Sequence, residues 1–174
     1  DNVNAKLESR RSARTDVVVI PNFVDNNWLT PVDGSPYRDE FGLGDGPIVM
    51  YAGNLGYSQS LDLMIDLAEQ RPEITVVING DGAMRDIVTE AALRLSNLHH
   101  IGYQPAQRLP EVLSAADIHV VPLRTGLGSV SVPSKTYSIL AVGKPVIAAI
   151  DEGSAVARLL ADANAGVSIP PDDV

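Results

Sequence analysis

The chain has 174 residues, of which 45% are hydrophobic, and this is enough to bury the core of one domain. A formal net charge of −9 with no basic stripe argues against a nucleic-acid partner. The absence of cysteine excludes disulfides and thiolate metal sites, and is compatible with a reducing cytoplasm. The longest apolar stretches, such as 146–150, have the length of a strand, whereas a membrane span needs about 20 residues.

The N-terminal segment carries neither a signal peptide pattern nor an initiator methionine. Residues 1–15 are polar and show little hydrophobic periodicity, so a linker or a helix remnant is predicted there. We expect one domain over 16–174, and we expect the sequence to be a fragment of a longer protein.

From residue 16 onward, short runs rich in Val and Ile alternate with amphipathic stretches. A first strand is predicted at 16–20, and the stretch 25–46, rich in Pro and Gly, is expected to be loop. Further strands are predicted at 47–52, 74–78, 99–102, 117–121, 145–149 and 166–169. Helices are predicted at 58–70, 83–95, 107–115, from 133 to about 143, and at 154–163.

Start signals support several of these helices. Ser58 and Ser154 are candidate N-caps, and Pro133 is a favoured first helical residue. The buried face of the helix at 83–95 is expected to consist of Ile87, Val88, Ala91 and Leu95.

Strands that are apolar throughout are typical of parallel sheets covered by helices on both faces. The sequence therefore predicts an α/β fold with a Rossmann-like, doubly wound parallel sheet. Ligands of such sheets bind beyond the carboxyl ends of the strands, so the loops that follow the strands are the candidate sites.

The first candidate loop is Gly53, Asn54, Leu55 and Gly56, between a strand and a helix. Glycines allow a phosphate to approach the backbone closely, but any tight strand-to-helix turn also uses them. The spacing differs from Gly-x-Gly-x-x-Gly, and no acidic residue ends the second strand at Ile78-Asn79, which argues against a nicotinamide dinucleotide site.

The second candidate loop contains Asp81 between two glycines. Its carboxylate is suited either to a ligand hydroxyl or to a structural turn and helix cap. The three histidines, His99, His100 and His119, have no metal-ligand spacing, so structural roles are expected and no metal is predicted.

The third region, 121–148, is the most specific. A loop of glycines and serines leads into a helix with Ser134 and Lys135 in its first turn and Ser138 one turn later. Hydroxyls, free amides and an ammonium converge there, as a diphosphate site requires. The alternative is an ordinary solvated helix start with a surface lysine.

Six segments occur in an order that resembles a known family. They are 21–25, 53–56, 79–82, 100–103, 115–122 and 133–147. Together they are similar to the C-terminal domain of GT-B retaining glycosyltransferases of group 1, also called family 4. The resemblance runs from about residue 16 to the end.

This resemblance implies a domain that holds a nucleotide diphospho-sugar, UDP- or GDP-linked, and a separate N-terminal domain that binds a glycan or lipid-linked acceptor. It implies metal-independent transfer with retention in polysaccharide or cell-envelope biosynthesis. A cytoplasmic location is implied, with peripheral membrane association through the other half. The resemblance names no catalytic residue here, and we expect the chain alone to be inactive.

By position, the first loop should face the donor diphosphate, and Gly102, Tyr103 and Gln104 should line the base. The residues implied at the diphosphate and sugar are Ser129, Val130, Ser131, Ser134 and Lys135. The resemblance places Ser138 at the ribose.

The chain departs from the family pattern at four positions. Many members carry an arginine and a lysine where Asn54 and Gln59 stand, and paired glutamates where Val130 and Ser138 stand. We therefore expect Lys135 to take over charge neutralisation.

Two other functions remain open from the sequence. A GT-B-like sugar-nucleotide epimerase would share the fold, but it needs acid/base side chains, and no paired carboxylates occur in the three loops. A noncatalytic nucleotide-binding or regulatory α/β domain would need an acidic cluster or a flavin loop, and neither is evident.

Overall fold

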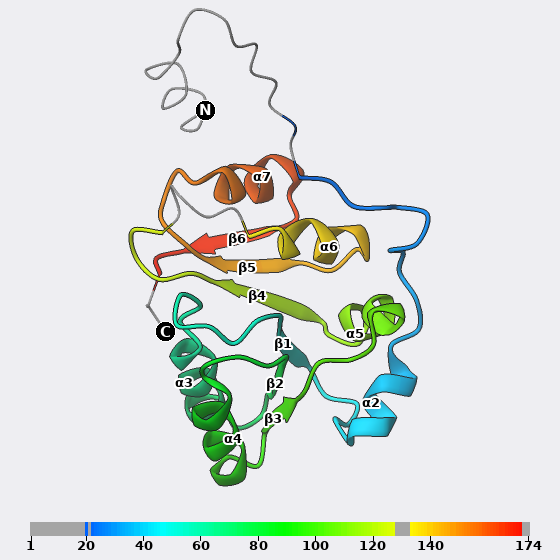
Figure 1. Ribbon diagram of the computed structural model, residues 1–174, viewed down its shortest axis with the longest axis vertical. Coiled ribbons are helices and arrows are strands. Elements are labelled where there is room, and N and C mark those ends of the chain that lie inside the picture. The colour runs from blue at the N-terminus through cyan, green and yellow to red at the C-terminus, as the bar shows by residue number, and fades with distance from the viewer. Residues whose placement is uncertain (1–19, 21, 128–132, 172–174) are drawn as a thin grey trace, which may run out of the picture.

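Strand β1 (Ile48–Ala52) lies in the middle of the sheet because its side chains are apolar on both faces. It pairs in parallel with β2 (Thr75–Asn79) and with β4 (Ile118–Pro122). The computed structural model describes residues 20, 22–127 and 133–171. Strands β3 (Leu98–Ile101), β5 (Val146–Ala149) and β6 (Gly166–Ile169) complete a parallel sheet of order β3-β2-β1-β4-β5-β6 (Figure 1). The predicted doubly wound sheet is confirmed.

Helices cover both faces of this sheet. They are α2 (Ser35–Phe41), α3 (Asp62–Gln70), α4 (Arg85–Arg94), α5 (Leu109–Ser114), α6 (Lys135–Ala141) and α7 (Ala155–Ala163), with a 3-10 turn at Ala106–Arg108. Apolar residues of α3 and α4 pack with Val49 and Tyr51. Those of α2 and α5 pack with Ile48 and Met50, while α6 and α7 pack on the same face farther along the sheet. In the part of the chain that the structure describes, no helix is long and apolar enough to cross a membrane.

The strand order places a topological switch point between β1 and β4. From β1 the chain continues outward to β2 and β3, and it then returns to pair β4 on the other side of β1. The loops that follow β1 and β4 therefore diverge at the carboxyl edge of the sheet, where α/β folds form their ligand crevice.

The stretch 25–46 is not loop throughout, since it contains α2. Pro36 lies in the first turn, where its missing N–H forfeits no helical hydrogen bond. Tyr37 is buried, and Gly42 ends the helix in the left-handed conformation with φ 62°. The prediction of loop was wrong because the prolines and glycines that delimit this short helix outnumber its apolar residues.

Four other local expectations need correction. Helix α6 begins at Lys135 after its N-cap residue Ser134, so Pro133 precedes the helix and is not its first residue. Helix α3 begins at Asp62, so Ser58 does not cap it, and its N-cap residue makes no side-chain bond. Ile87 on α4 is 49% exposed and does not belong to the buried face of the helix. That face contains Val88 and Ala91, as predicted. Ile20 lies in no strand and is exposed, while the rest of the strand predicted at 16–20 and the segment 1–15 lie outside the described residues.

The expected cap of the final helix is confirmed. The Ser154 hydroxyl accepts a hydrogen bond of 3.2 Å from the Ala157 amide, and α7 begins at the next residue after Ser154.

Candidate functional site

A cavity of about 450 Å³ opens at the carboxyl edge of the sheet. It is enclosed by the ends of β1 and β2, the loop after β3, helix α5 and the start of α6. Its polar side chains are Asn79, Tyr103, Gln104, Ser134, Lys135 and Ser138. Apolar residues from the segment 22–24 and from α5 cover the rest. A concave, largely apolar site with a few converging polar groups is typical of small-molecule binding.

The floor of the cavity is made by two loops whose backbones are in contact. The Gly53 amide donates to the Asn79 carbonyl at 2.8 Å, and the Leu55 amide donates to the Asp81 carbonyl at 2.8 Å. A Cβ on Gly80, whose φ is +148°, would lie 1.8 Å from the Gly53 carbonyl oxygen. A glycine is therefore required at position 80 by this close approach of the two loops.

Lys135, the first residue of α6, reaches across this floor. Its Nζ lies 3.9 Å from the centre of the Tyr51 ring, and a Cβ on Gly53 would lie 2.7 Å from the same atom. Burial lowers the pKa of Lys135 to about 7. Among the described residues, no carboxylate forms an ion pair with Lys135. The amino group of Lys135 therefore has no anionic partner among the described residues.

Tyr51 holds both the lysine and the first loop in place. The ring is fully buried, and its hydroxyl donates to the Asn54 carbonyl at 2.5 Å. Burial raises the pKa of this hydroxyl well above its usual value, so it stays a neutral donor.

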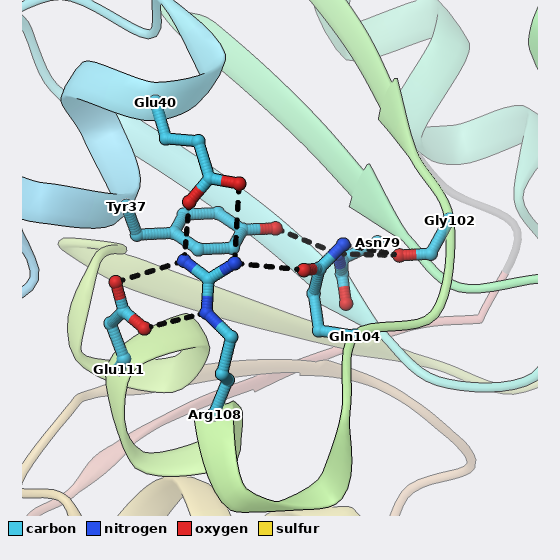
Figure 2. A network of polar contacts seen from close by, with 7 residues as sticks. All are labelled: Tyr37, Glu40, Asn79, Gly102, Gln104, Arg108 and Glu111. Carbon is cyan, nitrogen blue, oxygen red and sulfur yellow. Dashed lines mark hydrogen bonds and ion pairs between the residues drawn. The ribbon is translucent and has the colours of Figure 1, made fainter.

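Arg108 anchors the loop after β3 (Figure 2). Its five N–H donors make five hydrogen bonds, two to Glu40, two to Glu111 and one to the Gln104 side-chain oxygen. The guanidinium carbon also lies 5.6 Å from the centre of the Tyr37 ring. These hydrogen bonds raise the pKa of Arg108 and lower that of Glu111. Arg108 is therefore fully engaged by the protein and positions the loop.

Six of the residues predicted from the sequence line the cavity together. They are Gly53, Tyr103, Gln104, Ser134, Lys135 and Ser138. Ser129, Val130 and Ser131 lie outside the described residues.

Five other predicted residues lie in the loops around the cavity. Asn54 is exposed, and Leu55 is fully buried in the core with its carbonyl bonded to the Met84 amide. The Gly56 amide donates to the Gln59 side chain. The Asp81 carboxylate accepts from the Gly82 amide and pairs with Arg85 at 3.5 Å. The Gly102 carbonyl accepts from two side-chain amides. These groups support the loops, and the contact of the first loop with the cavity runs through Gly53.

Sequence reasoning missed Asn79, which lines the cavity and is only 5% exposed. The signal was available, because a single amide at the carboxyl end of an otherwise apolar strand occupies the edge where ligands bind. The apolar lining from Leu109, Val112 and Leu113 gave no such signal, since those residues also pack as ordinary helix core.

Two of the three histidines have structural partners. His119 is buried, its Nε2 lies 2.9 Å from the Leu113 carbonyl, and burial lowers its pKa to about 4. His100 contacts the Gly80 carbonyl and the Thr89 hydroxyl. Within the described ranges, no three His, Asp or Glu side chains are grouped as a metal site would need.

Comparison with known proteins decides the family. The family model described as "Glycosyl transferases group 1" matches residues 36–174. The chain belongs to this family.

Curated relatives carry names from the same family. A probable glycosyltransferase of Pseudomonas aeruginosa, WbjE, is 28% identical over 98% of this chain and 44% of its own length. The D-inositol 3-phosphate glycosyltransferase of Mycobacteroides abscessus is 32% identical over 91% of this chain and 36% of its own length. This group 1 chain thus spans less than half the length of these relatives.

Solved structures show the same fold. HepE of Anabaena, in complex with UDP-glucose, gives a TM-score of 0.69 at 22% identity, covering 90% of this chain and 44% of that chain. The C-terminal domain of LpcC, a group 1 glycosyl transferase from Francisella tularensis, gives 0.63 at 18% identity, covering 86% of this chain and 81% of that domain. The group 1 domain described here is therefore a GT-B-type α/β unit.

Proposed function

We propose that this chain is the donor-binding half of a retaining glycosyltransferase that uses a UDP- or GDP-linked sugar. The full enzyme transfers a hexosyl group to a glycan or lipid-linked acceptor held by an N-terminal domain. The isolated chain binds the donor but does not transfer the sugar. The similarity to a C-terminal domain of LpcC, most of whose length this chain covers, supports this division.

Lys135 carries the proposal. Among the described residues that line the cavity it is the one with a charged side chain, and its ammonium lies beside Gly53 at the end of β1. A diphosphate placed there gives this ammonium an anionic partner. As the sugar departs, negative charge grows on the leaving phosphate, and a fixed cation stabilises that charge without a metal.

Similar proteins support the substrate class. HepE has been solved with UDP-glucose and with UDP. Relatives from Escherichia coli and Bacillus subtilis are named for colanic acid and teichuronic acid biosynthesis, at 29% and 23% identity. We place the full enzyme in cell-envelope polysaccharide synthesis in the cytoplasm, with peripheral membrane contact made by its other half.

The lining of the cavity favours a transferase over an epimerase. None of the described residues that line it is Asp or Glu. An epimerase would need acid/base groups such as paired carboxylates beside the sugar. A lining free of carboxylates also avoids repulsion of the diphosphate in a chain whose formal net charge is −9.

Titration calorimetry with UDP, GDP and their monophosphates tests this function. A diphosphate brings more negative charge and more acceptor oxygens to Lys135 and to the start of α6 than a monophosphate does, so we expect the diphosphates to bind about tenfold more tightly than the monophosphates. Equal affinities for the two would contradict a diphosphate site at the start of α6.

A further inference from the structure

The carbonyl of Gly102 accepts hydrogen bonds from two side-chain amides that line the same cavity. The Asn79 Nδ2 and the Gln104 Nε2 each lie 3.2 Å from this oxygen (Figure 2). The two amides come from different strand ends and meet at the side of the cavity formed by the loop after β3.

The orientation of the Gln104 amide is fixed from both sides. A guanidinium only donates, so the atom 3.1 Å from Arg108 Nη1 must be the amide oxygen. A carbonyl only accepts, so the amide nitrogen must face Gly102. No described residue accepts from the second N–H of Gln104. The cavity therefore has one unused donor at this position.

The Asn79 amide is fixed in the same way. Its Nδ2 donates to the Tyr37 hydroxyl at 2.7 Å and to the Gly102 carbonyl, which uses both of its hydrogens. Among the described residues none donates to its Oδ1. Asn79 thus offers an unused acceptor, and its amide nitrogen shares the Gly102 carbonyl with the Gln104 amide that has the unused donor.

We infer that this amide pair selects the nucleobase of the donor by its lactam edge, the N–H adjacent to a C=O that uracil, thymine and guanine share. The inference rests on the proposed function, which places the diphosphate at Lys135 and so directs the nucleoside toward the loop after β3. The base carbonyl accepts from Gln104, and the base N–H donates to Asn79. Cytosine and adenine present an amino group and a bare ring nitrogen at this edge, which sets donor against donor and acceptor against acceptor.

Arg108 is the positioning residue for this selection. It does not line the cavity, and its contact with Gln104 is what keeps the amide oxygen turned away from the ligand. Without the guanidinium, the Gln104 amide is free to turn and to accept from an amino base. The preference for UDP over CDP and for GDP over ADP then decreases, whereas the charge at Lys135 is unchanged.

The test compares UDP with CDP and GDP with ADP by calorimetry, because the members of each pair differ at this edge. We expect the wild-type chain to bind UDP or GDP about tenfold or more tightly than its amino counterpart. Gln104→Leu and Arg108→Met should both bring this ratio close to one. Arg94→Met on α4, which breaks the exposed ion pair of Arg94 with Glu69 on α3, should keep the wild-type ratio.

Three results overturn the inference. A wild-type chain that binds both members of each pair equally overturns it and leaves the diphosphate site standing. A Gln104→Leu variant that keeps the wild-type affinity ratio of UDP to CDP and of GDP to ADP also overturns it, because the Gln104 amide then does not distinguish the bases. Loosening of the loop alone would weaken both nucleotides together and leave the ratio unchanged. If no nucleoside diphosphate binds, the proposed function fails first. A thermal melt checks that Arg108→Met folds. If Arg108→Met does not fold, the affinity ratio measured for Gln104→Leu alone tests the inference.

Discussion

The ammonium of Lys135 lies 3.9 Å from the centre of the buried Tyr51 ring, with its pKa lowered to about 7. A cation–π contact of this kind contributes roughly 0.5–2 kcal/mol, which offsets only part of the cost of removing an ammonium from water. The buried lysine therefore lowers the free energy of unfolding, and it provides a binding partner for an anion.

Donor binding should take up a proton. Since the free Lys135 has a pKa near 7, a bound diphosphate raises that pKa, and the complex carries the proton. Affinity for UDP-glucose should be greatest below about pH 7 and fall as the pH rises above it. Calorimetry at about pH 8 in buffers of different ionisation enthalpy should show uptake of about one proton. In Lys135→Arg, whose side chain is always charged, heats that still depended on the buffer would contradict this.

Lys135→Met should stabilise the chain at neutral pH. The folded pKa of about 7 lies below the usual value for lysine, so the unfolded state binds more protons between these values and stability rises with pH across that range. We expect the variant to be more stable by about 1–3 kcal/mol at neutral pH, which corresponds to about 2–4 °C in Tm per kcal/mol. Thermal melts at about pH 7 and 10 measure this, and the difference should shrink at the higher pH. A variant less stable than the wild type at pH 7 would contradict the claim that the buried charge of Lys135 destabilises the folded chain.

Gly53→Ala should weaken nucleotide binding more than its effect on folding explains. The new methyl group would lie 2.7 Å from Lys135 Nζ, and the φ of +147° is strained for any side chain. We expect a loss of about 1–3 kcal/mol in stability and displacement of the ammonium. Gly46→Ala is the matched control, because its added Cβ meets nothing within 4 Å. Unchanged UDP affinity in a folded Gly53→Ala chain would show that the ammonium is not needed at that spot.

His119 should make the chain sensitive to mild acid. Burial lowers its folded pKa to about 4, and its Nδ1 has no hydrogen-bond partner among the described residues. The unfolded histidine takes up a proton as the pH falls through about 6.5, so stability should fall by roughly 1–3 kcal/mol between there and pH 4. Urea unfolding of wild type and His119→Met at several pH values measures this slope. Equal slopes in the two proteins would assign the acid sensitivity to other groups.

The doubly wound parallel sheet and the edge that holds the cavity were predictable, because fully apolar strands that alternate with helices are typical of this fold and its ligands bind at the carboxyl ends of the strands. Lys135 could be singled out by its place after Pro133 at a helix start. Helix α2 was not predictable by the same reasoning, since its prolines and glycines read as loop until Tyr37 is seen in the core.

The amide pair needed the structure. Asn79 and Gln104 are 25 residues apart in the sequence and meet only because β2 pairs β3 in parallel. The way each amide faces depends on the Gly102 carbonyl and on Arg108, and neither contact leaves a trace in local sequence patterns. Likewise, the burial that lowers the pKa of Lys135 arises from packing across the floor loops.

The most direct measurement is the affinity of UDP and UMP for the wild-type chain, Lys135→Ala and Lys144→Ala. Lys144 serves as the control because it follows α6 and does not line the cavity at the carboxyl edge. A hydrogen bond to a charged group is worth roughly 1.5–3 kcal/mol, so Lys135→Ala should bind UDP about tenfold or more weakly, with a smaller effect on UMP and with the fold intact. If Lys135→Ala binds UDP like the wild type, the start of α6 is not the diphosphate site.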